Sequence, residues 1–255
     1  MTLKLVVLFF TPLIAGLMVY LVPSAKGSNF KLLLVFAGSY LFAITVTHIL
    51  PQLYLQNRGV ELLGLFVLAG FFLQQLLEYF TSGVEHGHIH TDEHDHDQGH
   101  HHSHAHQTVS ALVLLGALCV HAFLEGSVLA QPTTMGFGYD MNAVLLGIAL
   151  HTAPASFALM TVLTSQLHSK RKSLPYLIGF ALAAPVGLLI SSYFIESNVI
   201  SDTSMIYLYA LVSGNFLHIS TTIVFESSPE HRFHAKKLAV AVVGALVAVA
   251  VEYVI

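Results

Sequence analysis

Two ionisable side chains, His121 and Glu125, lie in the middle of an apolar segment that runs from Val109 to Ala130. Ionisable groups at membrane depth are costly, and they usually face a pathway or a binding site inside a helix bundle. The spacing of four residues places both side chains on the same face of a helix. An imidazole and a carboxylate on one face make half of a metal site.

A third candidate ligand, His151, lies in the next apolar segment. His121 precedes Ala130 by nine residues and His151 follows Asp140 by eleven. At about 1.5 Å per residue, both histidines lie roughly 14–17 Å below the same surface. His121, Glu125 and His151 therefore predict a site with two nitrogen donors and one oxygen donor, which water or a fourth ligand completes. Such a set suits zinc and its transition-metal neighbours better than calcium or magnesium, which prefer oxygen.

Other polar residues in apolar segments are weaker candidates. We take His48, His218 and Glu226 as candidate pathway residues, although each can also serve a simple structural role. Toward the inner end of the third apolar segment, three side chains are expected to form structural hydrogen bonds: Gln74, Gln75 and Glu78. Pro154 cannot donate a backbone hydrogen bond, which predicts a bend next to His151.

The composition predicts an all-α integral membrane protein. Of the 255 residues, 55% are hydrophobic and 9% are charged, whereas soluble domains carry about 25% charged residues. Crossing a bilayer takes about 20 apolar residues, and this length predicts eight transmembrane helices, at residues 3–22, 30–55, 60–82, 107–130, 140–166, 174–195, 203–226 and 236–255. We expect one membrane domain, with three helices in 1–82, a polar segment at 83–107 and five helices in 108–255. Nothing in the charge balance indicates nucleic-acid binding.

The basic residues predict the orientation of these helices, because lysine and arginine accumulate in cytoplasmic loops. Eight of the ten lie in or beside odd-numbered connections: Lys26, Lys31, Lys170, Arg171, Lys172, Arg232, Lys236 and Lys237. Lys4 and Arg58 are the exceptions. The odd-numbered connections are therefore expected in the cytoplasm, and both termini outside.

The polar segment 83–107 is predicted to be cytoplasmic and disordered, because it has too few apolar side chains to form a core. It carries ten histidines among several carboxylates: His86, His88, His90, His94, His96, His100, His101, His102, His104 and His106. Imidazole and carboxylate at this density suit divalent ions such as zinc, copper or nickel. The alternative is a solvated spacer without a metal-binding role.

These motifs resemble those of the ZIP family (Zrt-, Irt-like proteins) of divalent-metal transporters. His-Ala-Phe-Leu-Glu-Gly at 121–126 is similar to the family's fourth-helix signature, and Leu-His-Thr-Ala-Pro-Ala-Ser at 150–156 to its fifth-helix motif. Weaker similarities lie at residues 36–51, 184–187 and 213–226, in the same order along the chain as in the family, and the histidine-rich loop also matches. The resemblance implies an eight-helix bundle in which helices one to three and six to eight form an inverted repeat around helices four and five.

Three positions depart from the family pattern. Many relatives hold two metal ions, with further ligands at the positions occupied here by Ala122, Thr152 and Ala155. None of these three is a good ligand, so the second metal site is expected to be absent. The resemblance then implies a mononuclear site of His121, Glu125 and His151.

Transport of zinc toward the cytoplasm by alternating access is the leading functional hypothesis, with Fe²⁺, Mn²⁺ or Cd²⁺ as further substrates. We expect a plasma-membrane protein, a homodimer and no enzymatic activity. Two alternatives remain open at this stage. One is an intramembrane zinc-dependent lipid hydrolase, in which a metal-bound water attacks an amide or ester. The other is a metal sensor of the same fold that does not transport.

Overall fold

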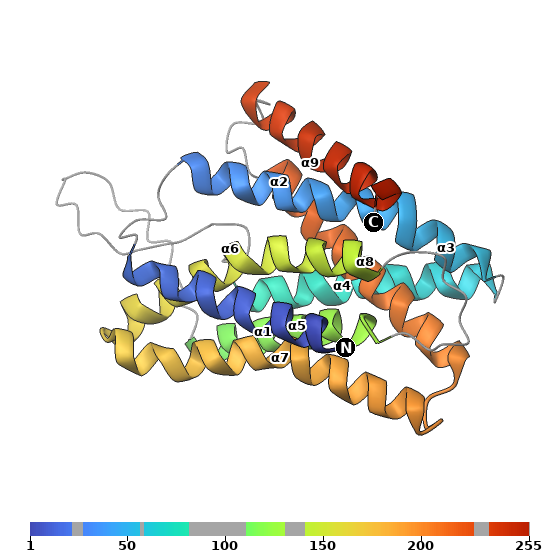
Figure 1. The fold of residues 1–255 in the computed structure, drawn as a ribbon, viewed down its shortest axis with the longest axis horizontal. Coiled ribbons are helices and arrows are strands. Elements are labelled where there is room, and N and C mark those ends of the chain that lie inside the picture. Colours follow the sequence, from blue (N-terminus) through green and yellow to red (C-terminus); the bar gives the residue numbers. More distant parts are fainter. Residues whose placement is uncertain (22–27, 57–58, 82–110, 131–140, 227–234, 255) are drawn as a thin grey trace, which may run out of the picture.

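The computed structural model describes residues 1–21, 28–56, 59–81, 111–130, 141–226 and 235–254, and these are almost entirely helical (Figure 1). The elements, in chain order, are α1 (Thr2–Leu17), η1 (Met18–Tyr20), α2 (Ser28–Ile44), η2 (Thr45–Ile49), α3 (Leu50–Leu55), α4 (Val60–Thr81), α5 (Ala111–Val128), α6 (Met141–Leu167), α7 (Lys170–Glu196), α8 (Asp202–Glu226) and α9 (Ala235–Val254). This confirms the prediction of an all-α protein for the described residues.

Five of the helical segments are long and apolar enough to cross a membrane. They are Thr2–Tyr20, Phe30–Leu55, Val60–Phe80, Met141–Leu167 and Lys170–Glu196, and Leu112–Val128 is a shorter apolar helix. Together with the composition, they make this an integral membrane protein. Helices also overlap the remaining two predicted spans, since α8 and α9 cover 202–226 and 235–254. The count of eight spans and their inverted arrangement stay predictions.

One predicted boundary was wrong. We expected the chain to leave the fifth helix near His168 and to enter the sixth only at 174, after the basic cluster. Instead α6 ends at Leu167 and α7 begins at Lys170, so the three basic residues form the first turn of α7. His168 adopts a left-handed conformation with φ of 49°, and the Ser169 side chain caps α7 by accepting a bond from the backbone N–H of Lys172. This cap explains the early start, because it satisfies one of the free N–H groups of the first turn.

The second predicted span is a continuous helix with an irregular centre. Between α2 and α3, residues Thr45–Ile49 form a π-helical turn, and Pro51 follows in the first turn of α3. Proline cannot donate to the preceding turn, and local widening of a helix is one way to accommodate this loss. His48 lies in this turn and is buried. π-helical turns are frequent at functional sites.

The described helices pack in two groups. α1, α5, α6 and α7 contact mainly one another, and α2, α4, α8 and α9 do the same. Figure 1 shows α7 along one edge of the molecule and α9 beside α2 along the opposite edge. Contacts of α2 with α6, and of α4 and α8 with α5, join the two groups. The predicted metal ligands lie on α5 and α6, which both belong to the first group.

Two glycines bring helices of each group into backbone contact. A Cβ atom at Gly126 of α5 would lie 1.9 Å from the carbonyl oxygen of Ala184 in α7. A Cβ atom at Gly214 of α8 would lie 1.9 Å from that of Val67 in α4. Small residues permit this close approach between membrane helices.

Polar side chains bind the C-terminal end of α5 and the N-terminal end of α6. Tyr209 of α8 donates a hydrogen bond to the carbonyl of Ala130 (2.5 Å), and Lys4 of α1 donates to the carbonyl of Leu129 (2.9 Å). Tyr40 of α2 donates to the carbonyl of Ala143, near the start of α6 (3.1 Å). The last carbonyls of a helix have no partner within the helix, so the Tyr209 and Lys4 side chains replace water at the end of α5. Two of the three bonds link the two helix groups.

Candidate metal centre

The structure brings the three predicted ligands together. The Nε2 atoms of His121 and His151 lie 3.1 and 2.8 Å from the same carboxylate oxygen, Oε1 of Glu125. The two Nε2 atoms lie 3.5 Å apart, and the candidate ligand atoms of the three residues lie within 4.8 Å of one another. As predicted from its depth, His151 lies beside the pair on α5.

The spacing of the donor atoms fits a small divalent ion. Zinc lies about 2.0–2.2 Å from nitrogen and oxygen ligands, which in a tetrahedral shell separates neighbouring donors by about 3.3–3.6 Å. The observed separations of 2.8–3.5 Å are close to this range. Small rotations of His121 and His151 away from Glu125 would make room for an ion between them.

All three side chains are shielded from solvent. The residues His121, Glu125 and His151 are 4%, 1% and 5% exposed. A carboxylate in such surroundings requires a positive partner, because burying an unpaired charge is costly. A protonated imidazole or a divalent cation would supply it. The site is therefore chemically suited to exchange protons for a metal ion.

A backbone carbonyl orients His151. Its Nδ1 atom lies 3.2 Å from the carbonyl oxygen of Gly147, one turn earlier in α6. When Nδ1 carries the proton and donates it to this carbonyl, the lone pair of Nε2 points toward Glu125. Metal-binding histidines commonly have such a partner on the other ring nitrogen. This role of Gly147 was not predicted, although the spacing of four residues on one helix could have indicated it.

A small cavity adjoins the triad. It has a volume of about 10 Å³ and is bounded by the triad and by Leu118, Thr152, Ala155, Phe180, Ile219 and Ile223. This is close to the smallest space that holds one water molecule. Phe180 comes from α7, and Ile219 and Ile223 come from α8, so both helix groups enclose the site. These apolar wall residues were not predicted, because a single apolar residue in an apolar helix carries no distinguishing signal.

The positions expected to lack a second metal site also adjoin this region. Thr152 and Ala155 line the cavity, and Ala122 lines a second small cavity on the α1 side. The Thr152 hydroxyl has no hydrogen-bond partner among the described residues. Within the described part of the chain, the triad is the one group of three or more His, Cys, Asp and Glu side chains close enough together to hold a metal.

The other candidate residues lie apart from the triad or outside the described residues. His48 is buried in η2. His218 of α8 is buried too, and its Nε2 lies 3.2 Å from Oε2 of Glu78 in α4. Glu226 is the last residue of α8, and its side chain lies outside the described residues. The ten histidines of 83–107 also lie outside them.

Comparison with known proteins identifies the family of this chain. The family model described as ZIP zinc transporter matches residues 82–252, which is more than half of the chain and includes all three triad residues. The chain belongs to the ZIP zinc transporter family. Within this ZIP protein, the match runs from the histidine-rich segment through α5, α6, α7 and α8 and into α9.

A curated relative matches part of the chain. This ZIP protein is 26% identical over 166 residues to the zinc transporter ZIP9 of Micropogonias undulatus. The matched region covers 64% of this chain and 50% of that protein, so the chain spans about half the length of the relative.

Proposed function

We propose that this ZIP protein transports divalent transition-metal ions, zinc above all, across a membrane toward the cytoplasm. The observation that carries the proposal is the buried triad, in which His121, Glu125 and His151 converge within 3.5 Å. Its two nitrogen donors and one oxygen donor suit zinc, and Fe²⁺, Mn²⁺ or Cd²⁺ could bind in the same way. In this proposal the site holds one ion at a time.

The shape of the site supports release toward the cytoplasm. In the orientation predicted from the basic residues, Leu118 and Ala155 lie on the inner side of the triad, and both line the adjoining cavity. On the outer side, Tyr40, Tyr209 and Lys4 bind the ends of α5 and α6. We therefore propose alternating access, in which α5 and α6 carry the ion between an outward-open state and this outward-closed state.

The proposal includes a definite topology. The chain crosses the plasma membrane eight times, with an inverted repeat of three helices on each side of α5 and α6. Both termini lie outside, and residues 83–107 lie in the cytoplasm, where their histidines bind metal after release. Residues 1–82 and 108–255 form one membrane domain, and two chains form a homodimer. Support comes from the helices that overlap each predicted span and from the distribution of lysine and arginine.

Uptake of radiolabelled zinc into proteoliposomes tests the function. We expect saturable uptake by the unmodified protein and loss of uptake in the double variant His121→Ala, Glu125→Ala. The control is His168→Ala, an exposed histidine at the end of α6. Undiminished uptake in the double variant would refute the site. Zinc binding without uptake would favour a sensor, and metal-dependent cleavage of the lipid would favour a hydrolase.

A further inference from the structure

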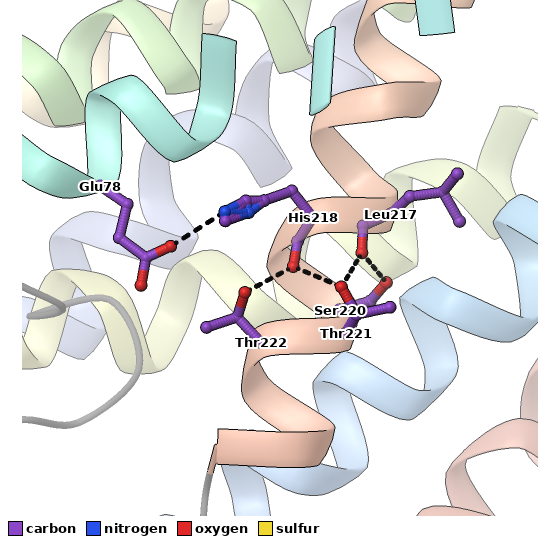
Figure 2. Close-up of polar contacts among 6 residues, drawn as sticks. All are labelled: Glu78, Leu217, His218, Ser220, Thr221 and Thr222. Atoms are coloured by element: carbon purple, nitrogen blue, oxygen red, sulfur yellow. Dashed lines mark hydrogen bonds and ion pairs between the residues drawn. The ribbon is translucent and has the colours of Figure 1, made fainter. Parts of the chain in front are cut away.

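Besides the triad, a carboxylate and an imidazole meet between α4 and α8, and both are side-chain types that bind metals. Oε2 of Glu78 and Nε2 of His218 are 3.2 Å apart, and both side chains point into the contact between their helices (Figure 2). Their side chains are 17% and 8% exposed. These residues are 140 positions apart in the chain, and they belong to a different helix group from the triad.

The crossing of α4 and α8 is rigid at this point. A Cβ atom at Gly70 would lie 1.8 Å from the carbonyl oxygen of Leu211, and one at Gly214 would lie 1.9 Å from that of Val67. One turn beyond Gly214, the His218 ring stacks on Phe71, with ring centres 4.8 Å apart and planes 20° apart. Backbone contact and ring stacking together hold the imidazole in one orientation, with Nε2 facing Glu78.

Neighbouring hydroxyl groups are already engaged in hydrogen bonds. Figure 2 shows that Thr222 donates to the carbonyl of His218 (2.8 Å). Thr221 donates to the carbonyls of Leu217 and His218, and Ser220 donates to that of Leu217. The candidate donors at this crossing are therefore the Glu78 carboxylate and the His218 imidazole, and not these hydroxyl groups.

Two further buried polar side chains lie within one turn of the pair on the same two helices. Gln74, one turn before Glu78, and Asn215, three residues before His218, are both completely buried. Neither side-chain polar atom of Asn215 has a hydrogen-bond partner among the described residues. Buried polar groups that lack partners are expensive, and inside membranes they mark pathways for ions or substrates.

The part of α8 that carries His218 also borders the triad cavity. Ile219 directly follows His218, and it lines that cavity together with Ile223. In the predicted orientation α8 runs inward, so Ile223 lies one turn nearer the cytoplasm than Ile219. Glu78 and His218 therefore meet beside the part of α8 that bounds this cavity.

We propose that Glu78 and His218 form a second binding position for the divalent transition-metal ion, inside of the triad. This inference rests on the proposed function, because it makes the pair a station on the exit path. The 3.2 Å separation is close to the roughly 3.3–3.6 Å between neighbouring donors around a tetrahedral zinc ion. Two protein ligands, with water completing the shell, bind more weakly than three, which suits release.

Zinc binding at equilibrium tests the inference on the full-length chain. The parent protein carries serine in place of the ten histidines of 83–107, so that this segment does not bind zinc. We expect Glu78→Gln and His218→Gln each to bind one zinc ion fewer per chain than the parent. The variant His121→Ala should also lose one ion, and its combination with Glu78→Gln should lose two. The control His168→Gln should lose none.

The outcomes are distinct. If Glu78→Gln and His218→Gln keep the zinc content of the parent while their thermal stability falls, the pair is a structural contact and the inference is wrong. Zinc uptake separates this result from a failure of the proposed function. If triad variants take up zinc normally, transport through the triad is refuted, but loss of zinc from the pair variants would still establish an inner site.

A second variant covers the case in which the glutamine variants do not fold. His218→Cys keeps a metal ligand at this position and replaces nitrogen with the softer sulfur, which favours Cd²⁺. We expect the ratio of Cd²⁺ to Zn²⁺ affinity to rise at least about tenfold over the parent, which already contains Cys119. An unchanged ratio would overturn the inference.

Discussion

The triad on α5 and α6 and the Glu78–His218 pair between α4 and α8 use the same side-chain types but are built differently. In the triad, two ligands come from one helix turn, and the third lies on the following helix at the same depth. In the pair, each ligand comes from a helix far away in sequence, and a crossing at Gly70 and Gly214 brings them together. Local spacing can therefore build most of one site, whereas the other depends entirely on helix packing.

The two sites also differ in enclosure. The triad is at most 5% exposed and has three potential ligands, whereas Glu78 is 17% exposed and has one partner ligand. A more enclosed site with more ligands selects and holds an ion, and a less enclosed pair releases it more easily. If both sites bind the same ion, we expect the triad to have the higher affinity and the pair the faster dissociation.

The largest effect is expected from Glu125→Gln. Glu125 contacts both histidines of the triad, so the substitution removes the negative charge and disturbs two contacts at once. Changes even to groups that support metal ligands cost 10- to 100-fold. We expect zinc uptake into proteoliposomes to fall by at least about 100-fold. Glu61→Gln, at the start of α4, is the matched control. Uptake within tenfold of the unmodified protein would argue that Glu125 is not a ligand.

Two glycine substitutions should each impair one of the two sites. Gly126→Ala forces apart α5 and α7, and Gly214→Ala forces apart α8 and α4, because each new Cβ would lie 1.9 Å from a carbonyl oxygen. Overpacking typically costs about 1–3 kcal/mol, and we expect lower thermal stability in both variants. Zinc binding should weaken at the triad in the first and at the pair in the second.

The matched control is Gly116→Ala, also on α5, where an added Cβ meets no atom of the described residues within 4 Å. It should leave stability and both sites unchanged. If Gly126→Ala and Gly214→Ala impair the same site, the triad and the pair do not depend on separate helix contacts.

A smaller effect is expected from Tyr209→Phe. Tyr209 lies on α8, the helix of the pair, and it binds the end of α5, the helix of the triad. Side-chain hydrogen bonds between membrane helices are worth about 0.6 kcal/mol. We expect a loss of this size in unfolding free energy and greater labelling of a cysteine placed at Thr152 by an outside reagent. Equal labelling with and without Tyr209→Phe would show that the bond does not close the outer end.

The smallest effect is expected from Thr152→Ala. The Thr152 hydroxyl lines the triad cavity but has no hydrogen-bond partner among the described residues. Removing it breaks no bond, so zinc uptake should change by less than about twofold. A large loss of uptake, measured beside Thr161→Ala as a control, would make Thr152 a ligand and would contradict a site of three residues.

Much of the fold followed from the pattern of apolar segments. Each predicted span overlaps a helix, because long apolar runs bounded by proline, glycine and charged residues leave few other structures. The start of α7 was missed, because a basic cluster normally indicates a loop and the Ser169 cap is a local detail. The π-helical turn at Thr45–Ile49 was missed as well, since Pro51 indicates an irregularity but not its form.

The candidate ligands were predictable to different degrees. His121 and His151 were predicted to lie together, because two consecutive helices have their connected ends at the same membrane surface. The number of residues from that end then gives the depth of each side chain. His218 was taken as a candidate pathway residue because it lies within an apolar segment, whereas Glu78 was given only a structural role, and the two were not paired. Their contact depends on which helices are neighbours and on how they cross, and apolar helices in lipid carry little sequence signal for either.

The sequence by itself determined the pairing of His121 with Glu125, since the pitch of an α-helix places residues four apart on one face whatever surrounds them. It also determined the membrane setting, because so few charges over so many apolar residues cannot form a soluble domain. Only the tertiary structure decided which apolar side chains enclose the triad and that Glu78 meets His218. Both results require close backbone contact between distant segments, at Gly126 and Ala184 in one group of helices and at Gly214 and Val67 in the other. Such contact depends on the complementary shapes of two helix surfaces, and the sequence of one helix does not specify the shape of the other.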